Sequence, residues 1–267
     1  MVNSISPTIE KVMQAIKELI KTVAKLRSPN GCPWDKEQTH KSLKRYLIEE
    51  AYETIDAIDN NNPKEIMEEL GDVLLQVVLH SQIASEKRLF SFNKVANHIN
   101  KKMITRHPHV FSNVTVKNSD EVMKNWEIIK NQEKGKKKAL LDSVPKSLPA
   151  LLKGIKISKK VAKEGFEWAN EKELITSLKS EVKELEEAIK LKDKKAQIEE
   201  LGDLLFMIVN LSRWYKIDPE ETLNHAIKKF ISRFEKVKHL AKVNKKKINN
   251  LSHKELNHLW QQAKRRK

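Results

Sequence analysis

The chain is 267 residues long, enough for one large domain or two of ordinary size. Glycine and proline together contribute only 14 residues and charged residues 33%, a composition typical of helical proteins that nearly excludes an all-β fold. The net charge of +16 is concentrated in residues 136–267, where 32 lysines and arginines face 18 acids. This basic half favours a polyanionic partner, although lysines interspersed with glutamates more often form a solvated face.

Several broad classes of protein are excluded at this stage. The six glycines are too far apart for a phosphate-binding glycine loop. The single cysteine, Cys32, cannot form an internal disulfide, which suits a reducing cytosol. Residues 1–10 do not resemble a secretory signal, and no apolar run approaches the roughly 20 residues of a membrane span. We therefore expect a cytoplasmic protein with no membrane partner.

The apolar residues follow helical spacing along the chain. Leu43, Leu47 and Ala51 begin a face that continues to residue 58, and the segment 60–63 (NNNP) is typical of a helix end followed by a helix start. The next helix carries an apolar stripe at positions 70, 73, 74, 77 and 78, which recurs at 201, 204, 205, 208 and 209. Asp218 and Pro219 predict the start of a later helix.

An internal repeat organises these elements. Residues 68–75 (EELGDVLL) recur as residues 199–206 (EELGDLLF), 131 positions later. Further pairs recur in the same order: Glu50 and Glu53 as Glu181 and Glu184, Lys102 and Arg106 as Lys229 and Arg233, Trp126 and Lys130 as Trp260 and Lys264. We predict an all-α protein of two tandem four-helix-bundle-like domains, residues 1–135 and 136–267, joined by a lysine- and proline-marked connector at about 132–149.

The repeated acids form the candidate site. Glu50 and Glu53 lie on one helix face, and Glu69 and Asp72 lie on the next helix, which a short turn makes an antiparallel neighbour. Carboxylates gathered in this way repel one another unless a divalent cation lies among them, and oxygen ligands favour Mg²⁺ first and Mn²⁺ second. The second copy repeats the set with Glu181, Glu184, Glu200 and Asp203.

Ordinary solvated helix acids are the alternative, but the identical spacing in both copies and the position beside an apolar stripe weigh against it. A di-iron centre would need Glu-x-x-His pairs; no histidine occupies those positions, and His80 lies eight residues past Asp72. Gly71 and Gly202 adjoin these acids in both copies. Such glycines indicate the close approach of another helix or a ligand, unless they reflect drift.

Cations and aromatics recur beside the acids. A Lys and an Arg one helical turn apart suit the phosphate oxygens that a metal leaves free, and each tryptophan could either stack on a base or pack in the core. Together these parts indicate metal-assisted hydrolysis of a nucleoside polyphosphate, in which the metal orients the phosphates and activates a water. Glu49 could take the proton of that water, and Cys32 has no visible activating partner.

Several longer motifs resemble those of MazG nucleoside triphosphate pyrophosphohydrolases. They are residues 27–40 (RSPNGCPWDKEQTH), 47–53 (LIEEAYE), 106–111 (RHPHVF), 141–151 (LDSVPKSLPAL) and 259–262 (LWQQ). The resemblance extends from about Ile9 to Lys264. It implies tandem all-α domains, a homodimer whose helices pack between subunits, and Mg²⁺-dependent hydrolysis of nucleoside triphosphates to monophosphate and pyrophosphate, a clearance of the nucleotide pool.

The family pattern, EExxE followed by ExxD, places metal ligands at the four acids of each copy named above. The resemblance also implies that the second copy is the main catalytic one. There Glu181, Glu184, Glu200, Asp203, Lys229 and Arg233 would be catalytic, and Lys229, Arg233, Trp260, Lys264 and Glu199 would bind substrate. The chain departs from the pattern at Ser180, where the first copy has Glu49, so the sequence leaves open which copy works.

Two other functions stay open: a basic helical nucleic-acid-binding module and a regulatory scaffold without catalysis. The base, the sugar and the phosphorus that is attacked are also undetermined by these patterns.

Overall fold

The computed structural model describes residues 7–133 and 140–265. The lysine run of the predicted connector, at 134–138, and the first six residues lie outside the described part. Regular structure in the described ranges is helical throughout, as the composition predicted, and no strand occurs there. Contacts divide the chain into two compact units, residues 1–135 and 136–267. None of the described helices combines the length and the apolar character needed to cross a membrane.

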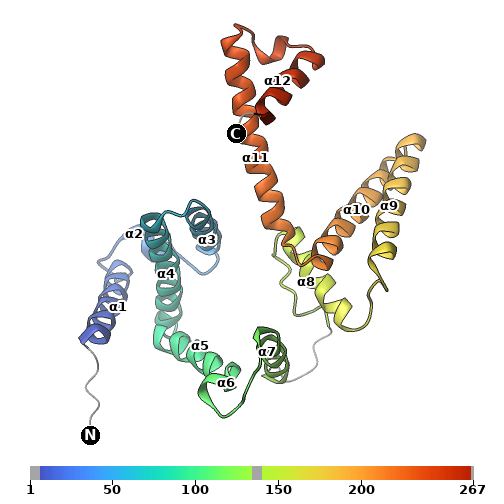
Figure 1. Cartoon of the computed structure of the whole chain (residues 1–267). Helices are drawn as coiled ribbons and strands as arrows, with labels where there is room; N and C mark the ends of the chain where they lie inside the picture. The colour runs from blue at the N-terminus through green and yellow to red at the C-terminus, as the bar shows by residue number, and fades with distance from the viewer. Residues whose placement is uncertain (1–6, 134–139, 266–267) are drawn as a thin grey trace. The chain divides into compact units, whose positions relative to one another are not determined.

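The first unit is built around the paired helices α3 and α4, with α1 packed against α4 (Figure 1). Its core consists of buried residues that these helices and the loop before α3 contribute: Val23, Leu43, Val78, Leu79 and Ile83. The elements, in chain order, are α1 (Pro7–Leu26), α2 (Pro33–Glu37), α3 (Lys44–Asp59), α4 (Pro63–Glu86), α5 (Phe92–Arg106), α6 (Pro108–Phe111) and α7 (Ser119–Glu133).

The turn between α3 and α4 has the predicted chemistry. Asn61 adopts a left-handed conformation with φ of 52°, which asparagine tolerates better than most residues. Asn62 caps α4 by accepting a hydrogen bond of 3.2 Å from the backbone N–H of Lys64, and Pro63 occupies the first turn. This tight connection makes α3 and α4 antiparallel neighbours, as the candidate site requires.

The second unit contains α8 (Ala150–Lys163), α9 (Glu171–Leu191), α10 (Lys194–Trp214), α11 (Pro219–Val243), the 3₁₀ turn η1 (Ile248–Asn250) and α12 (His253–Arg265). Helices α9 and α10 pair side by side, and α8 packs on α10. A Cβ at Gly154 of α8 would lie 3.2 Å from Val209, so the absence of a side chain permits this close packing. Helix α11 diverges from α10, and α12 packs on the far half of α11 (Figure 1).

Each unit therefore has five helices longer than ten residues in its described part, one more than the pattern indicated. The additional helices are α1 and α8. Both precede the repeated motifs, so the internal repeat did not indicate them. The prediction of an all-α protein with two tandem repeats is confirmed.

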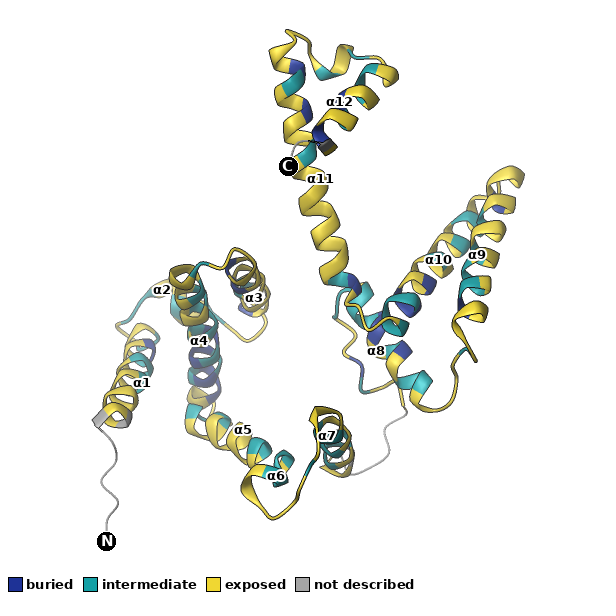
Figure 2. Ribbon diagram, in the orientation of Figure 1, coloured by how far each residue is buried: buried dark blue, intermediate teal, exposed yellow. Residues whose placement is uncertain are grey.

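Large apolar side chains are left uncovered in the second unit. Every residue from 221 to 232, the middle of α11, is exposed (Figure 2). An apolar stripe runs along this helix through Leu223, Ile227, Phe230, Ile231 and Phe234, which are 39–56% exposed. A second stripe on α10 consists of Ile198, Leu201, Leu205 and Ile208, which are 42–66% exposed. Isolated apolar side chains are normal on a surface, but contiguous stripes indicate an interface.

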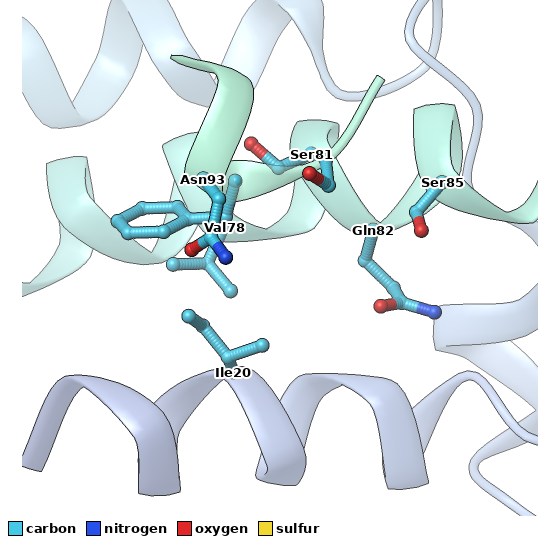
Figure 3. Close-up of a pocket in the computed structure, with 8 residues that line it drawn as sticks. Ile20, Val78, Ser81, Gln82, Ser85 and Asn93 are labelled. Atoms are coloured by element: carbon cyan, nitrogen blue, oxygen red, sulfur yellow. The ribbon is translucent and has the colours of Figure 1, made fainter. Parts of the chain in front are cut away.

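A small pocket of about 140 Å³ lies in the first unit between α1, α4 and α5 (Figure 3). Ile20 and Val78 form its apolar side, and Ser81, Gln82 and Asn93 are among the polar residues that line it. No acid, cation or tryptophan of the predicted site lines this pocket. The candidate site is therefore found elsewhere.

Candidate active site

The first acid cluster lies where α3 and α4 face each other. Oxygen atoms of Glu50, Glu69 and Asp72 all lie within 4.8 Å of one another. Glu53 is outside this trio, yet it is close enough to add to the pKa rise of Glu50 and Glu69. The predicted quartet is therefore assembled around a tighter group of three.

The second acid cluster repeats this arrangement on α9 and α10, with a different trio. Oxygen atoms of Glu181, Glu184 and Glu200 lie within 4.8 Å of one another, and here Asp203 is the member outside the group. Asp203 nevertheless raises the pKa of both Glu181 and Glu200 by its charge. Glu199 is exposed and contributes to the raised pKa of Glu200.

Burial is the largest cause of the raised pKa in both clusters, and repulsion between the acids follows. A cation among the oxygens would relieve both costs, because it favours the ionised form. The clusters found in the described residues contain carboxylates only, which fits Mg²⁺ or Mn²⁺ and does not fit a di-iron centre with histidine ligands. These oxygen ligands are therefore chemically suited to a hard divalent ion.

Ser180, the departure from the family pattern, contacts the second cluster directly. Its hydroxyl donates a hydrogen bond of 2.8 Å to Oε1 of Glu184. Glu49 at the equivalent position of the first copy would bring another negative charge instead. The two copies thus differ in what lies beside an otherwise equivalent set of acids.

The cations are held differently in the two copies. Arg106 of the first copy forms an ion pair with Glu133, with Nε to Oε2 at 3.1 Å, and its guanidinium lies 5.4 Å from the centre of the Trp126 ring. Lys130 pairs with Glu127 at 3.1 Å. In the second copy no such ion pair holds Arg233 within the described ranges. Only the second copy therefore leaves its arginine available for phosphate.

One chain does not bring its second-copy cations to its acids. Lys229 and Arg233 lie on α11, which diverges from the α9–α10 pair that carries the acid cluster (Figure 1). Trp260 and Lys264 lie on α12, at the far half of α11. The Trp260 ring packs against the α11–α12 core, with its centre 5.3 Å from that of Phe230. Trp260 remains half-buried in this packing, and its predicted role in binding substrate stays a prediction.

Gly71 and Gly202 are not approached by any helix of the same chain in the described structure. A Cβ built at either position meets nothing within 4 Å. The expectation of close approach is therefore not met within one chain, because both glycines are exposed on helix faces that no other described element covers.

A polar group that was not predicted from the sequence lies beyond the first acid cluster. Gln76 and His80 follow Asp72 at one-turn intervals along α4, and Nδ1 of His80 lies 2.7 Å from Nδ1 of His40. Oε1 of Gln76 and Nε2 of His80 are buried without a hydrogen-bond partner. The repeat offered a signal for this difference, since the second copy has Met207 and Leu211 at the equivalent positions.

Comparisons with known proteins cover both copies of the acid set. The family model described as the MazG nucleotide pyrophosphohydrolase domain matches residues 38–111 and 169–238, and each segment contains one full acid set and one Lys/Arg pair. The chain is 45% identical over 249 residues to the nucleoside triphosphate pyrophosphohydrolase/pyrophosphatase MazG of Thermotoga maritima, covering 93% of this chain and 95% of that protein. It is 38% identical over 258 residues to the nucleoside triphosphate pyrophosphohydrolase of Escherichia coli K12, covering 95% and 98%. The uncharacterized protein YabN of Bacillus subtilis is 45% identical over 247 residues, which are 91% of this chain and 50% of YabN.

Proposed function

Since the chain belongs to the MazG nucleotide pyrophosphohydrolase family, we propose that it hydrolyses nucleoside triphosphates to the monophosphate and pyrophosphate. The observation that carries the proposal is the duplicated cluster of carboxylates on adjacent helices, with oxygen atoms within 4.8 Å. The proposal places the reaction in the cytoplasm, where the unpaired Cys32 would stay reduced.

Mg²⁺ is the proposed cofactor, with Mn²⁺ as a substitute. Glu181, Glu184, Glu200 and Asp203 would hold it in the second copy, and Glu50, Glu53, Glu69 and Asp72 in the first. When bound, the ion would supply positive charge to the phosphates and make an attacking water more acidic. The chain's own part is to keep the carboxylates preorganised on two paired helices and to place Lys229 and Arg233 on the phosphate oxygens.

The second copy is the proposed catalytic one. Its arginine, Arg233, is not engaged in an ion pair in the described structure, whereas Arg106 of the first copy is bound by Glu133 and covers Trp126. An arginine that must first leave an ion pair would bind phosphate more weakly, because it gives up one charged partner for another. The first copy would then have a regulatory or structural role.

Product analysis tests the reaction. Purified protein incubated with ATP and Mg²⁺ should release AMP and pyrophosphate, and EDTA should stop the release. Glu181→Gln combined with Glu184→Gln should abolish turnover, while Glu50→Gln combined with Glu53→Gln should retain most of it. Release of ADP and phosphate would overturn the reaction, and loss of activity only in the first-copy variant would overturn the assignment of the catalytic copy.

The active form is proposed to be a homodimer. The apolar stripes on α10 and α11 are exposed in the single chain, and a second copy would cover them with its own helices. Pairing of this kind would also bring the cations on α11 of one chain toward the acids on α9 and α10 of its partner.

Mixed subunits test this arrangement. Light scattering should give twice the mass of the 31.0 kDa chain. Glu184→Gln and Arg233→Ala should each inactivate a homodimer. After mild dissociation and mixing, heterodimers should recover activity, because one of their two sites then combines intact acids with an intact arginine. A monomeric protein of full activity, or mixtures as inactive as the separate variants, would contradict the proposal.

A further inference from the structure

The last part of the second unit contains a lysine-lined cleft of about 500 Å³. Its lining comes from the end of α11, the following turn and η1, and consists of Lys238, Ala241, Lys242, Lys245, Lys246, Lys247, Ile248 and Asn249. Five of these eight residues are lysines, and no acid is among them. We name this feature the lysine cleft.

Only two of the five positive charges are neutralised by the protein. Lys238 pairs with Glu235 at 3.0 Å, and Lys246 pairs with Glu255 of α12. Within the described residues no ion pair or hydrogen bond holds the ammonium groups of Lys242, Lys245 and Lys247. The cleft therefore presents a net charge of about three, and a concave surface of one sign concentrates its field on a counter-ion.

The shape of the lysine cleft is fixed by the core beneath it. Ala241 is 1% exposed in the α11–α12 core, and Ile248 packs against that core from η1. Lys245 adopts a left-handed conformation with φ of 54°, which turns the chain back after α11. A lysine in the last turn of a helix interacts favourably with the helix dipole, which explains Lys242. Lys245 and Lys247 follow the helix, so the dipole does not explain them.

The lining indicates the class of ligand. No aromatic side chain faces the cleft, so it lacks the platform on which bases of a nucleic acid or a nucleotide would stack. The cleft is shallow and open to solvent, and its volume of about 500 Å³ is within the range of small-molecule sites. Ammonium groups bind phosphate as point charges, and three of them match the charge of a short phosphate chain.

We propose that the lysine cleft binds a short inorganic polyphosphate anion, such as pyrophosphate or tripolyphosphate, at a site separate from the acid clusters. This inference goes beyond the hydrolysis proposed above and does not depend on it. The lysines belong to α11 and the turn that follows it, whereas the acids belong to α9 and α10.

Metal-free calorimetry on the full chain tests the proposal. Tripolyphosphate and pyrophosphate are titrated in EDTA, because the acid clusters repel anions when no cation is present. The test variant combines Lys242→Gln, Lys245→Gln and Lys247→Gln, and circular dichroism confirms its helix content. The matched control combines Lys156→Gln, Lys159→Gln and Lys190→Gln, which remove the same charge from exposed positions on α8 and α9.

The test variant should bind tripolyphosphate at least about tenfold more weakly than the unmodified chain, because it lacks three ammonium groups that would contact the phosphate oxygens. The control should bind nearly as the unmodified chain does, and so should Glu181→Gln with Glu184→Gln, even if that variant has no hydrolase activity. Equal tripolyphosphate affinity of the test variant and the unmodified chain would contradict the proposed site. A 20-nucleotide single-stranded DNA that binds the same lysines more tightly than tripolyphosphate would overturn the assignment to a small anion.

Discussion

The hydroxyl of Ser180 donates a hydrogen bond of 2.8 Å to Oε1 of Glu184, one turn further along α9. This contact holds one oxygen of a carboxylate that we propose to bind metal, without adding the negative charge that Glu49 adds in the first copy. Groups that orient metal ligands change metal affinity about 10- to 100-fold when they are removed. We therefore propose that Ser180 positions the Glu184 carboxylate.

Ser180→Ala should weaken Mn²⁺ binding by about tenfold, measured by electron paramagnetic resonance without nucleotide. Ser180→Thr should restore the affinity, because it keeps the hydroxyl. Thr176→Ala is the matched control, since Thr176 on the same helix donates its hydroxyl to the backbone oxygen of Lys172 instead. Unchanged Mn²⁺ affinity in Ser180→Ala would show that the hydrogen bond has no positioning role.

The two equivalent arginines should respond differently to replacement by alanine. Arg233→Ala should lower kcat/KM by about 100-fold, because a charged contact to the reacting phosphates is lost. Arg106→Ala should leave kcat/KM within a few-fold and lower the free energy of unfolding only slightly, because exposed ion pairs such as Arg106–Glu133 contribute little to stability. Steady-state kinetics and urea unfolding measure both effects. An equal loss of activity in the two variants would contradict the assignment of the second copy.

Gly202→Ala should raise the stability of the protein and lower its activity. A Cβ there meets nothing within 4 Å, so alanine should raise the free energy of unfolding by up to about 1 kcal/mol, because alanine favours the helix more than glycine does. The same methyl group would lie beside Asp203, where substrate or a partner helix is proposed to approach, so kcat/KM should fall. Gly71→Ala is the matched control in the first copy and should stabilise without the loss of activity. Full activity of Gly202→Ala would show that neither a partner helix nor the substrate approaches Gly202.

The start of α12 should lose stability in acid through Glu255. Hydrogen bonds from Lys246 first, and from Ser252 next, lower the pKa of Glu255 to about 2. A lowered carboxyl pKa contributes stability that is complete above the ordinary value of 4.5 and is lost as the pH falls toward 2.

Glu255→Gln should therefore lower the melting temperature at pH 7, and the gap to the unmodified chain should narrow as the pH is lowered from 4.5. Glu235→Gln is the control, because its exposed pair with Lys238 should contribute little at any pH. Scanning calorimetry between pH 7 and pH 3 measures the gap. A gap that stays constant over this range would show that ionisation of Glu255 does not stabilise α12.

Features that depend on near neighbours in the chain could be predicted from the sequence. Acids three residues apart share a helix face whatever surrounds the helix, and the Asn60–Pro63 turn makes the next helix an antiparallel neighbour. The all-α class, the tandem repeat and the convergence of Glu50 with Asp72 all follow from such local rules. The helices α1 and α8 were missed because they precede the repeated motifs.

The sequence by itself determined that the four acids of each copy lie on two paired helices, because helical periodicity and a short turn fix that geometry locally. Only the tertiary structure decided which three carboxylates in each set approach most closely, that Glu133 engages Arg106 from 27 positions away, and that α11 diverges from α10. These outcomes depend on how distant segments pack. Packing depends on the shape and charge of whole surfaces, and residues that are far apart in the sequence form these surfaces together.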